Sequence, residues 1–235
     1  MRAYAQNSSP ESPALVRQLI EHMESLSTMY PSVQPDYSCH NVYIFAVNEA
    51  MNRGHIHNID GAILTQQYLE MMLSRSNDTL VAPDKWTFNM VLNAWSKSGS
   101  PDMVERAELV LTMMEDYHNQ CGRTMKTTPN ANTYNTMLSC YSRCSNLPDK
   151  ADRAHALLQK MKQLYHSGTN LHAQPDAITY NIVMNLCAKT GRRTSPSKCF
   201  CFKKIQIGYK LIATIYHLLL CVIFLFGFDV FLKEN

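Results

Sequence analysis

Four asparagine residues recur along the chain at a nearly constant spacing. Asn41, Asn89, Asn135 and Asn181 are separated by 48, 46 and 46 residues. A side-chain amide carries two hydrogen-bond donors and one acceptor, which are the groups needed to read the Watson–Crick edge of a nucleic-acid base. Recurrence at a period of this length is typical of stacked repeats rather than of a single catalytic centre. The asparagines are therefore predicted to form a ladder, with one in each repeat.

Each asparagine closes a similar segment, and a helical pattern follows it. The segments are PDYSCHN (35–41), PDKWTFN (83–89), PNANTYN (129–135) and PDAITYN (175–181). The spacing Ala-x3-Leu-x2-Met begins at Ala107 and again at Ala154, and it places these residues on one face of a helix. Ser100 before Pro101 is typical of an N-cap and a first helical position. The pattern predicts an all-α fold, a right-handed superhelical solenoid of stacked helix-turn-helix repeats.

These segments resemble the repeats of the pentatricopeptide-repeat family of RNA-binding proteins. The resemblance rests on Pro-Asp before x-x-Thr-Tyr-Asn, on the turn Ala-x-Ser-Lys-x-Gly at 94–99, and on the Ala-x3-Leu-x2-Met face. It covers roughly residues 1–191. The repeats here are longer than those typical of the family. The first full repeat also departs from the pattern, with Cys39-His40-Asn41 in place of Thr-Tyr-Asn and Glu49 where later repeats carry a cation.

The resemblance implies that each asparagine reads one base of single-stranded RNA together with the last residue of its own repeat. The implied pairs are Asn41 with Asp84, Asn89 with Asn130, and Asn135 with Asp176. In the family, Asn with Asp favours uracil and Asn with Asn favours a pyrimidine, which gives U-[C/U]-U read 5′ to 3′. The repeat that contains Asn181 breaks off before its pairing position. The residues implied to flank the bases are Ser38, Trp86, Asn132 and Ile178.

A cation recurs two helical turns after the asparagine, at Lys97, Arg143 and Lys189. The family resemblance implies that these side chains contact RNA phosphates. A cation at this position would also complement the negative end of the helix dipole, and the two roles are compatible. The net charge of +3 and the pI of about 8.4 are too small to indicate a nucleic-acid partner by themselves.

Single-stranded RNA is the expected partner, with a protein-binding scaffold of the tetratricopeptide kind as the alternative. The tetratricopeptide signature Trp-x2-Leu-Gly-x2-Tyr does not occur in the sequence. No phosphate-binding loop, Gly-x-Ser-x-Gly or zinc-deaminase pattern occurs either, so neither catalysis nor a cofactor is expected. His55 with His57, and Cys140 with Cys144, do not complete a zinc-binding spacing and are expected in a turn and in helix packing.

The chain divides into segments of different kinds. Residues 1–36 correspond to a partial repeat, and 37–84, 85–130 and 131–176 to three full repeats. Residues 177–192 start a broken repeat, and 193–235 form a hydrophobic tail. Met1 aligns inside the first helix of a repeat, so we expect that the chain is a fragment or begins at a misplaced start. The resemblance implies a mitochondrion or plastid and a role in organellar RNA processing, stability or translation.

The hydrophobic tail admits two interpretations. Residues 211–228 carry no Asp, Glu, Lys or Arg and are long enough for a transmembrane helix. The tail nevertheless interrupts a repeat halfway through its hairpin, which favours an altered C-terminus, such as a translated intron or a frameshift. The alternative is a real anchor that attaches the protein to a membrane.

Overall fold

The structure is a computed structural model, which describes residues 9–76, 78, 80–121 and 126–189. These residues form helices and connecting turns, with no strand among them. The chain divides into two compact units, Met1–Val183 and Met184–Asn235. Helix α9 (Ala177–Lys189) crosses this boundary, and its last six residues are the described part of the second unit.

Two kinds of helix alternate along the first unit, here termed A and B helices. The A helices are α3 (Tyr37–Asn52), α5 (Lys85–Ser98), α7 (Ala131–Arg143) and the start of α9. The B helices are α2 (Ser12–Ser27), α4 (Asn58–Ser74), α6 (Met103–Gln120) and α8 (Lys150–His166). Short 3-10 helices, η1 (Pro31–Val33) and η2 (Leu171–Ala173), precede α3 and α9. The prediction of an all-α helical-repeat solenoid is confirmed.

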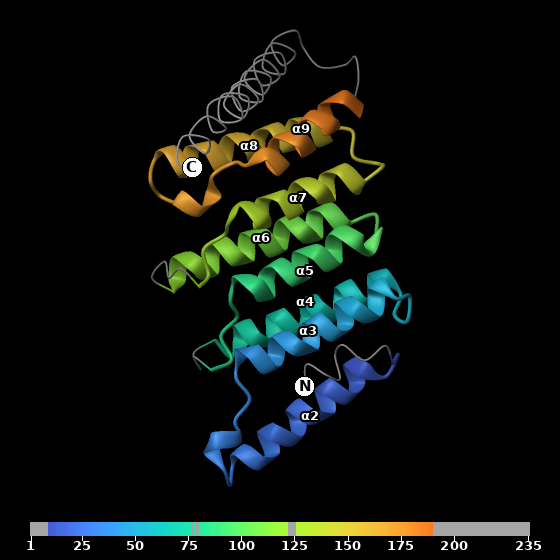
Figure 1. The fold of residues 1–235 in the computed structure, drawn as a ribbon, viewed down its shortest axis with the longest axis vertical. Coiled ribbons are helices and arrows are strands. Elements are labelled where there is room, and N and C mark those ends of the chain that lie inside the picture. The colour runs from blue at the N-terminus through green and yellow to red at the C-terminus, as the bar shows by residue number, and fades with distance from the viewer. Residues whose placement is uncertain (1–8, 77, 79, 122–125, 190–235) are drawn as a thin grey trace, which may run out of the picture. The chain divides into compact units, whose positions relative to one another are not determined.

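The A helices carry most of the packing between repeats. Each of α3, α5 and α7 packs against the B helix before it and the B helix after it. Consecutive A helices also pack on one another, α3 on α5 and α5 on α7, so that the hairpins follow in chain order (Figure 1). Groups at the same position of neighbouring A helices are therefore brought close together.

The apolar face of the B helices is buried as its spacing predicts. Ala107 and Met114 in α6 are completely inaccessible to solvent, as is Leu158 in α8. In α4 the equivalent face is formed by Leu69 and Met72, which are also fully buried. Removal of this apolar surface from water is the main favourable contribution to the stability of such an array.

The predicted start of α6 at Ser100 and Pro101 is wrong. The helix begins at Met103 with Asp102 as its N-cap residue. Gly99 ends α5 in the left-handed conformation, with φ of +68°, and the chain then turns through residues 100–102. The Ser100 hydroxyl donates to the Asp102 carboxylate, and the Met103 N–H donates to the Ser100 carbonyl at 3.2 Å. The hydroxyl expected to cap the helix therefore closes this turn instead.

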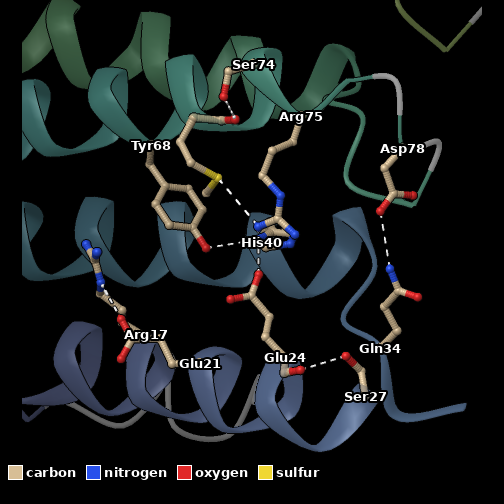
Figure 2. Close-up of polar contacts among 11 residues, drawn as sticks. Arg17, Glu21, Glu24, Ser27, Gln34, His40, Tyr68, Ser74, Arg75 and Asp78 are labelled. Atoms are coloured by element: carbon tan, nitrogen blue, oxygen red, sulfur yellow. Dashed lines mark hydrogen bonds and ion pairs between the residues drawn. The ribbon is translucent and has the colours of Figure 1, made fainter. Parts of the chain in front are cut away.

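Polar contacts join α2 to the first full repeat (Figure 2). Arg75, at the C-terminal end of α4, donates to Glu24 of α2 at 2.7 Å. His40 occupies the position at which the other A helices carry an aromatic residue. It is 1 % exposed, and its Nδ1 lies 2.8 Å from the Tyr68 hydroxyl. Burial lowers the pKa of His40, so the neutral ring is favoured. The degenerate repeat thus keeps a buried ring in contact with its B helix.

Replacing Leu111 with alanine should destabilise the array, because this side chain of α6 is only 6 % exposed. The expected loss in the free energy of unfolding is about 2–5 kcal/mol, as for other buried leucines. Leu109 lies on the same helix, is 41 % exposed, and serves as the matched control. Leu109→Ala should change the free energy by about 0.5 kcal/mol or less. Urea unfolding followed by circular dichroism measures both, and equal losses would contradict the assignment of the buried face.

Candidate nucleic-acid interface

Each later A helix starts with a reciprocal cap that fixes the residues around it. Asp84 precedes α5 in an extended conformation, and its side chain accepts the Thr87 N–H at 2.9 Å. The Thr87 hydroxyl accepts the Asp84 N–H at 3.1 Å in return. Asn130 with Thr133 forms the same box at the start of α7. Two of the otherwise unsatisfied N–H groups at each helix start thereby find acceptors.

At the first junction between full repeats, Asn41 contacts this cap. Its Nδ2 donates to Asp84 Oδ1 at 3.3 Å, and its Oδ1 accepts the Thr87 hydroxyl at 2.6 Å. Asn41 is only 3 % exposed. The asparagine of one repeat is therefore bonded both to the residue with which it is predicted to pair and to a threonine of the following A helix.

The junction between α7 and α9 has the same arrangement. Asn135 Nδ2 donates to Asp176 Oδ1 at 3.1 Å, and the Thr179 hydroxyl donates to Asn135 Oδ1 at 2.7 Å. The Thr179 N–H donates to the same Asp176 oxygen at 2.8 Å. Asn135 is 7 % exposed, while Asp176 is exposed to solvent. Two of the three predicted pairs are thus brought together in the same geometry.

The middle junction differs. No hydrogen bond joins Asn89 to Asn130 in the described part of the chain, and Asn89 Oδ1 is buried there without a hydrogen-bond partner. The Thr133 hydroxyl donates to Asn130 Oδ1 at 3.1 Å instead of reaching back to the preceding repeat. Asn181, the last asparagine of the ladder, is exposed on α9. The ladder is therefore regular in sequence but not in its contacts.

Hydrogen bonding sets the protonation of the Asp176 carboxyl. Its partial burial would raise the pKa, but bonds from the Thr179 N–H, the Asn135 amide and the Thr179 hydroxyl stabilise the charged form. These bonds prevail and hold the pKa of Asp176 below its ordinary value. The group is an ionised acceptor at neutral pH.

The four residues implied to flank the bases all occupy the second position of an A helix and are exposed. They are Ser38, Trp86, Asn132 and Ile178. Trp86 is 45 % exposed, and its ring is stacked on Phe45 of the preceding A helix with centroids 6.4 Å apart. One face of this indole is covered by protein and part of the ring remains open to solvent.

The recurring cations lie in the last turn of their A helices, and Lys97 and Arg143 reach back to the preceding repeat. Lys97 Nζ donates to Asn52 Oδ1 at 2.9 Å. Arg143 donates to Ser96, to its carbonyl at 3.2 Å and to its hydroxyl at 2.9 Å. Lys97 and Arg143 line one hollow of about 400 Å³, and among the described residues no carboxylate forms an ion pair with either of them. Lys189 is exposed at the end of α9.

The threonines that bond the asparagines, Thr87 and Thr179, are functional candidates that the repeat pattern did not single out. Their signal is the spacing Asp-x-x-Thr, in which threonine replaces the usual glutamate or glutamine of a capping box. That spacing predicts the cap but not the second bond across the repeat junction. Ser96, the acceptor for Arg143, was also missed, although it is the serine of the turn Ala-x-Ser-Lys-x-Gly at 94–99.

Among residues 9–76, 78, 80–121 and 126–189, no group of three or more His, Cys, Asp or Glu side chains could hold a metal ion. Cys140 and Cys144 are buried, and burial raises the pKa of the Cys140 thiol to about 12. No helix within these ranges is long and apolar enough to cross a bilayer. The tail at 193–235, with the predicted span at 211–228, lies outside the described residues.

Comparison with known families matches one hairpin of this array. A family model described as a PPR repeat matches residues 132–165, which contain most of α7 and α8. This segment is therefore similar to a PPR repeat. The similarity supports the resemblance to the pentatricopeptide-repeat family, and it indicates a nucleic-acid or protein partner. No curated protein matches the chain.

Replacing Asp176 with asparagine should reduce the loss in the free energy of unfolding at acid pH. Because the folded-state pKa of Asp176 is lowered, its contribution to stability is present above about pH 4 and is lost as the pH falls through the lower folded-state value. Asparagine keeps the capping oxygen but does not titrate. Urea unfolding from about pH 6 to about pH 2 should show a larger loss for the wild type than for the variant.

The middle junction supplies the reverse control for this prediction. Asn130→Asp introduces a carboxylate at the equivalent cap and should add a loss of stability in acid. Parallel curves for the wild type and Asp176→Asn would show that the carboxylate makes no special contribution to the junction.

Proposed function

We propose that the chain binds single-stranded RNA with base selectivity, without catalysis of its own, and serves the processing, stability or translation of organellar transcripts. The observation that carries this proposal is the pair of matching junctions. Asn41 with Asp84, and Asn135 with Asp176, form the same amide–carboxylate contact. Each contact uses one amide N–H and one carboxylate oxygen. The second N–H and Asp Oδ2 make no hydrogen bond among the described residues.

A donor beside an ionised acceptor is complementary to uracil. The Watson–Crick edge of uracil presents carbonyl acceptors and the N3–H donor, whereas N3 of cytosine is an acceptor and would face the carboxylate. The Asn–Asp junctions therefore favour uracil over cytosine. At the middle junction, Asn89 and Asn130 are both neutral amides, so either pyrimidine is accommodated. Reading this edge requires an unpaired base, which is why the proposed ligand is single-stranded.

The backbone of the RNA has a separate binding site in this proposal. Lys97 and Arg143 line one hollow from neighbouring repeats and pair with neutral groups, so their charge is available to a phosphate. Lys189 recurs at the same position of α9. The exposed second residues of the A helices, Trp86 among them, would lie beside the bases.

A protein-binding scaffold is the competing function, and one observation favours it. Asn41 and Asn135 are 3 % and 7 % exposed, and both bond to the next repeat. These residues would serve a scaffold equally well by holding its hairpins together. Recognition of RNA requires that a base edge reach these junctions, and binding measurements separate the two functions.

By resemblance to the family, we propose a mitochondrial or plastid location. Fractionation of cells that express the chain from its own locus, compared with organelle markers, would test this. Recovery outside both organelles would contradict it.

The full chain should bind short RNAs that contain U-C-U more tightly than purine oligomers of equal length at moderate salt. Asn135→Ala should weaken pyrimidine binding by about tenfold or more, because it removes both a hydrogen bond to the base and the bond across the junction. Asn119, exposed on the B helix α6, is the control, and Asn119→Ala should bind like the wild type. Fluorescence anisotropy measures all three. Binding without base preference would contradict base recognition, and no binding would favour the scaffold.

The double variant Lys97→Gln with Arg143→Gln should weaken binding to all RNAs by the same factor. The slope of log K against log salt should decrease by about 0.7 for each phosphate that the variant no longer neutralises. Arg17→Gln with Arg106→Gln is the charge-matched control, because these arginines pair with Glu21 and Asp102 and lie outside the hollow. An unchanged salt slope in the double variant would show that the hollow does not bind phosphate.

A further inference from the structure

The hydroxyl of Thr87 makes a contact across the repeat junction that capping alone does not require. It lies 2.6 Å from Asn41 Oδ1 and 2.9 Å from Asp84 Oδ1. A hydroxyl has one proton, and the shorter contact, to the asparagine, is the stronger bond. Thr179 repeats the pattern, at 2.7 Å from Asn135 Oδ1 and 2.9 Å from Asp176 Oδ1. Both threonines are fully buried.

We propose that Thr87 and Thr179 are positioning residues that fix the amide orientation of the asparagine in the preceding repeat. This inference rests on the proposed function and assigns to these threonines a part of its base specificity. The amide of Asn41 has two orientations, which exchange its carbonyl and its NH2 group. The Thr87 hydroxyl holds the carbonyl on its own side, and Asp84 accepts from the NH2 group.

The opposite orientation breaks the bonds to both partners. It would place Asn41 Oδ1 against the Asp84 carboxylate, two acceptors without a proton between them. It would also break the 2.6 Å bond that the Thr87 hydroxyl donates to Asn41 Oδ1, and the hydroxyl would have to accept from the NH2 group instead. Because the amide is held in one orientation, the remaining N–H always stands beside the carboxylate. That fixed pairing of donor and acceptor is what distinguishes uracil from cytosine.

The middle junction lacks this contact, and its cap residue is Asn130 in place of an aspartate. Thr133 is fully buried like Thr87, but its hydroxyl donates to Asn130 Oδ1 at 3.1 Å. Asn89 Oδ1 has no partner in the part of the chain that the structure describes. The amide of Asn89 is consequently not held by a threonine, and this junction should discriminate between uracil and cytosine only weakly.

The test is Thr87→Val in the full chain, because valine keeps the buried shape and removes the hydroxyl. Affinities are measured for RNAs with uracil or cytosine at the base assigned to Asn41. The ratio of the two affinities should fall by about fivefold, the effect of one hydrogen bond, and Thr87→Ser should restore it. The ratio at the base assigned to Asn135 should not change.

Thr133→Val is the matched control. It removes the same capping hydroxyl from a buried threonine, but one that does not contact the preceding asparagine. It should leave the uracil-to-cytosine ratio at the base assigned to Asn41 unchanged. Thermal unfolding of both valine variants measures the lost bonds: both variants lose the cap, and Thr87→Val also loses the bond to Asn41.

The outcomes separate this inference from the proposed function. If the wild type prefers uracil at the first base and Thr87→Val keeps the full ratio, the positioning role is wrong and RNA recognition stands. If Thr133→Val lowers the ratio at the base assigned to Asn41 as much as Thr87→Val does, the effect belongs to loss of a cap in general and the inference also fails. If the wild type shows no base preference, both the inference and base-selective RNA binding are overturned.

Discussion

The start of each A helix is the constraint on which this array depends. The first N–H groups of a helix have no partner within it, and a buried helix start must supply acceptors from elsewhere. Here Asp84, Asn130 or Asp176 provides one. At two junctions the same carboxylate also accepts from the asparagine of the preceding repeat. One side chain thus caps a helix and bonds it to the preceding repeat. At these positions the start of the helix and the stacking of the repeats depend on the same carboxylate.

A second set of contacts holds the register between repeats on α6, α7 and α8. Arg153 bonds to Glu108 at 3.0 Å and Lys160 to Glu115 at 2.7 Å, and in each pair the residues are 45 positions apart. Tyr141 and Tyr134 donate to the same two glutamates. The glutamates, the tyrosines and the cations are each separated by seven residues, which is two helical turns. Because these ion pairs are partly exposed, each contributes little energy. These ion pairs fix how α6, α7 and α8 align with one another, while burial of the apolar face of the B helices supplies most of the stability of the array.

Much of this arrangement could be predicted from the sequence, because it follows from periodicity. The helical repeats and the buried Ala-x3-Leu-x2-Met face depend on residue type and spacing alone. The Asp-x-x-Thr spacing predicts a cap for the same reason. Whether Thr133 reaches Asn89 or Asn130 depends on rotamers and on small displacements between two helices, and no spacing encodes these. The start of α6 was missed for a related reason, since Ser100 can cap a helix or close a turn and Gly99 decides between them.

The dual use of the cap limits how recognition could vary among repeats. Under the proposed function, the residue that reads a base with the asparagine also has to start an α-helix. Asp, Asn, Ser and Thr cap well, whereas apolar residues and long cationic side chains do not. Asp84 and Asn130 both satisfy the helix, but among the described residues only Asp84 and Asp176 accept the amide of the preceding asparagine. A change from Asp to Asn therefore leaves the helix start intact and releases the asparagine before it. Under the proposed function, base preference and the stiffness of the junction would change together, because both depend on the same carboxylate.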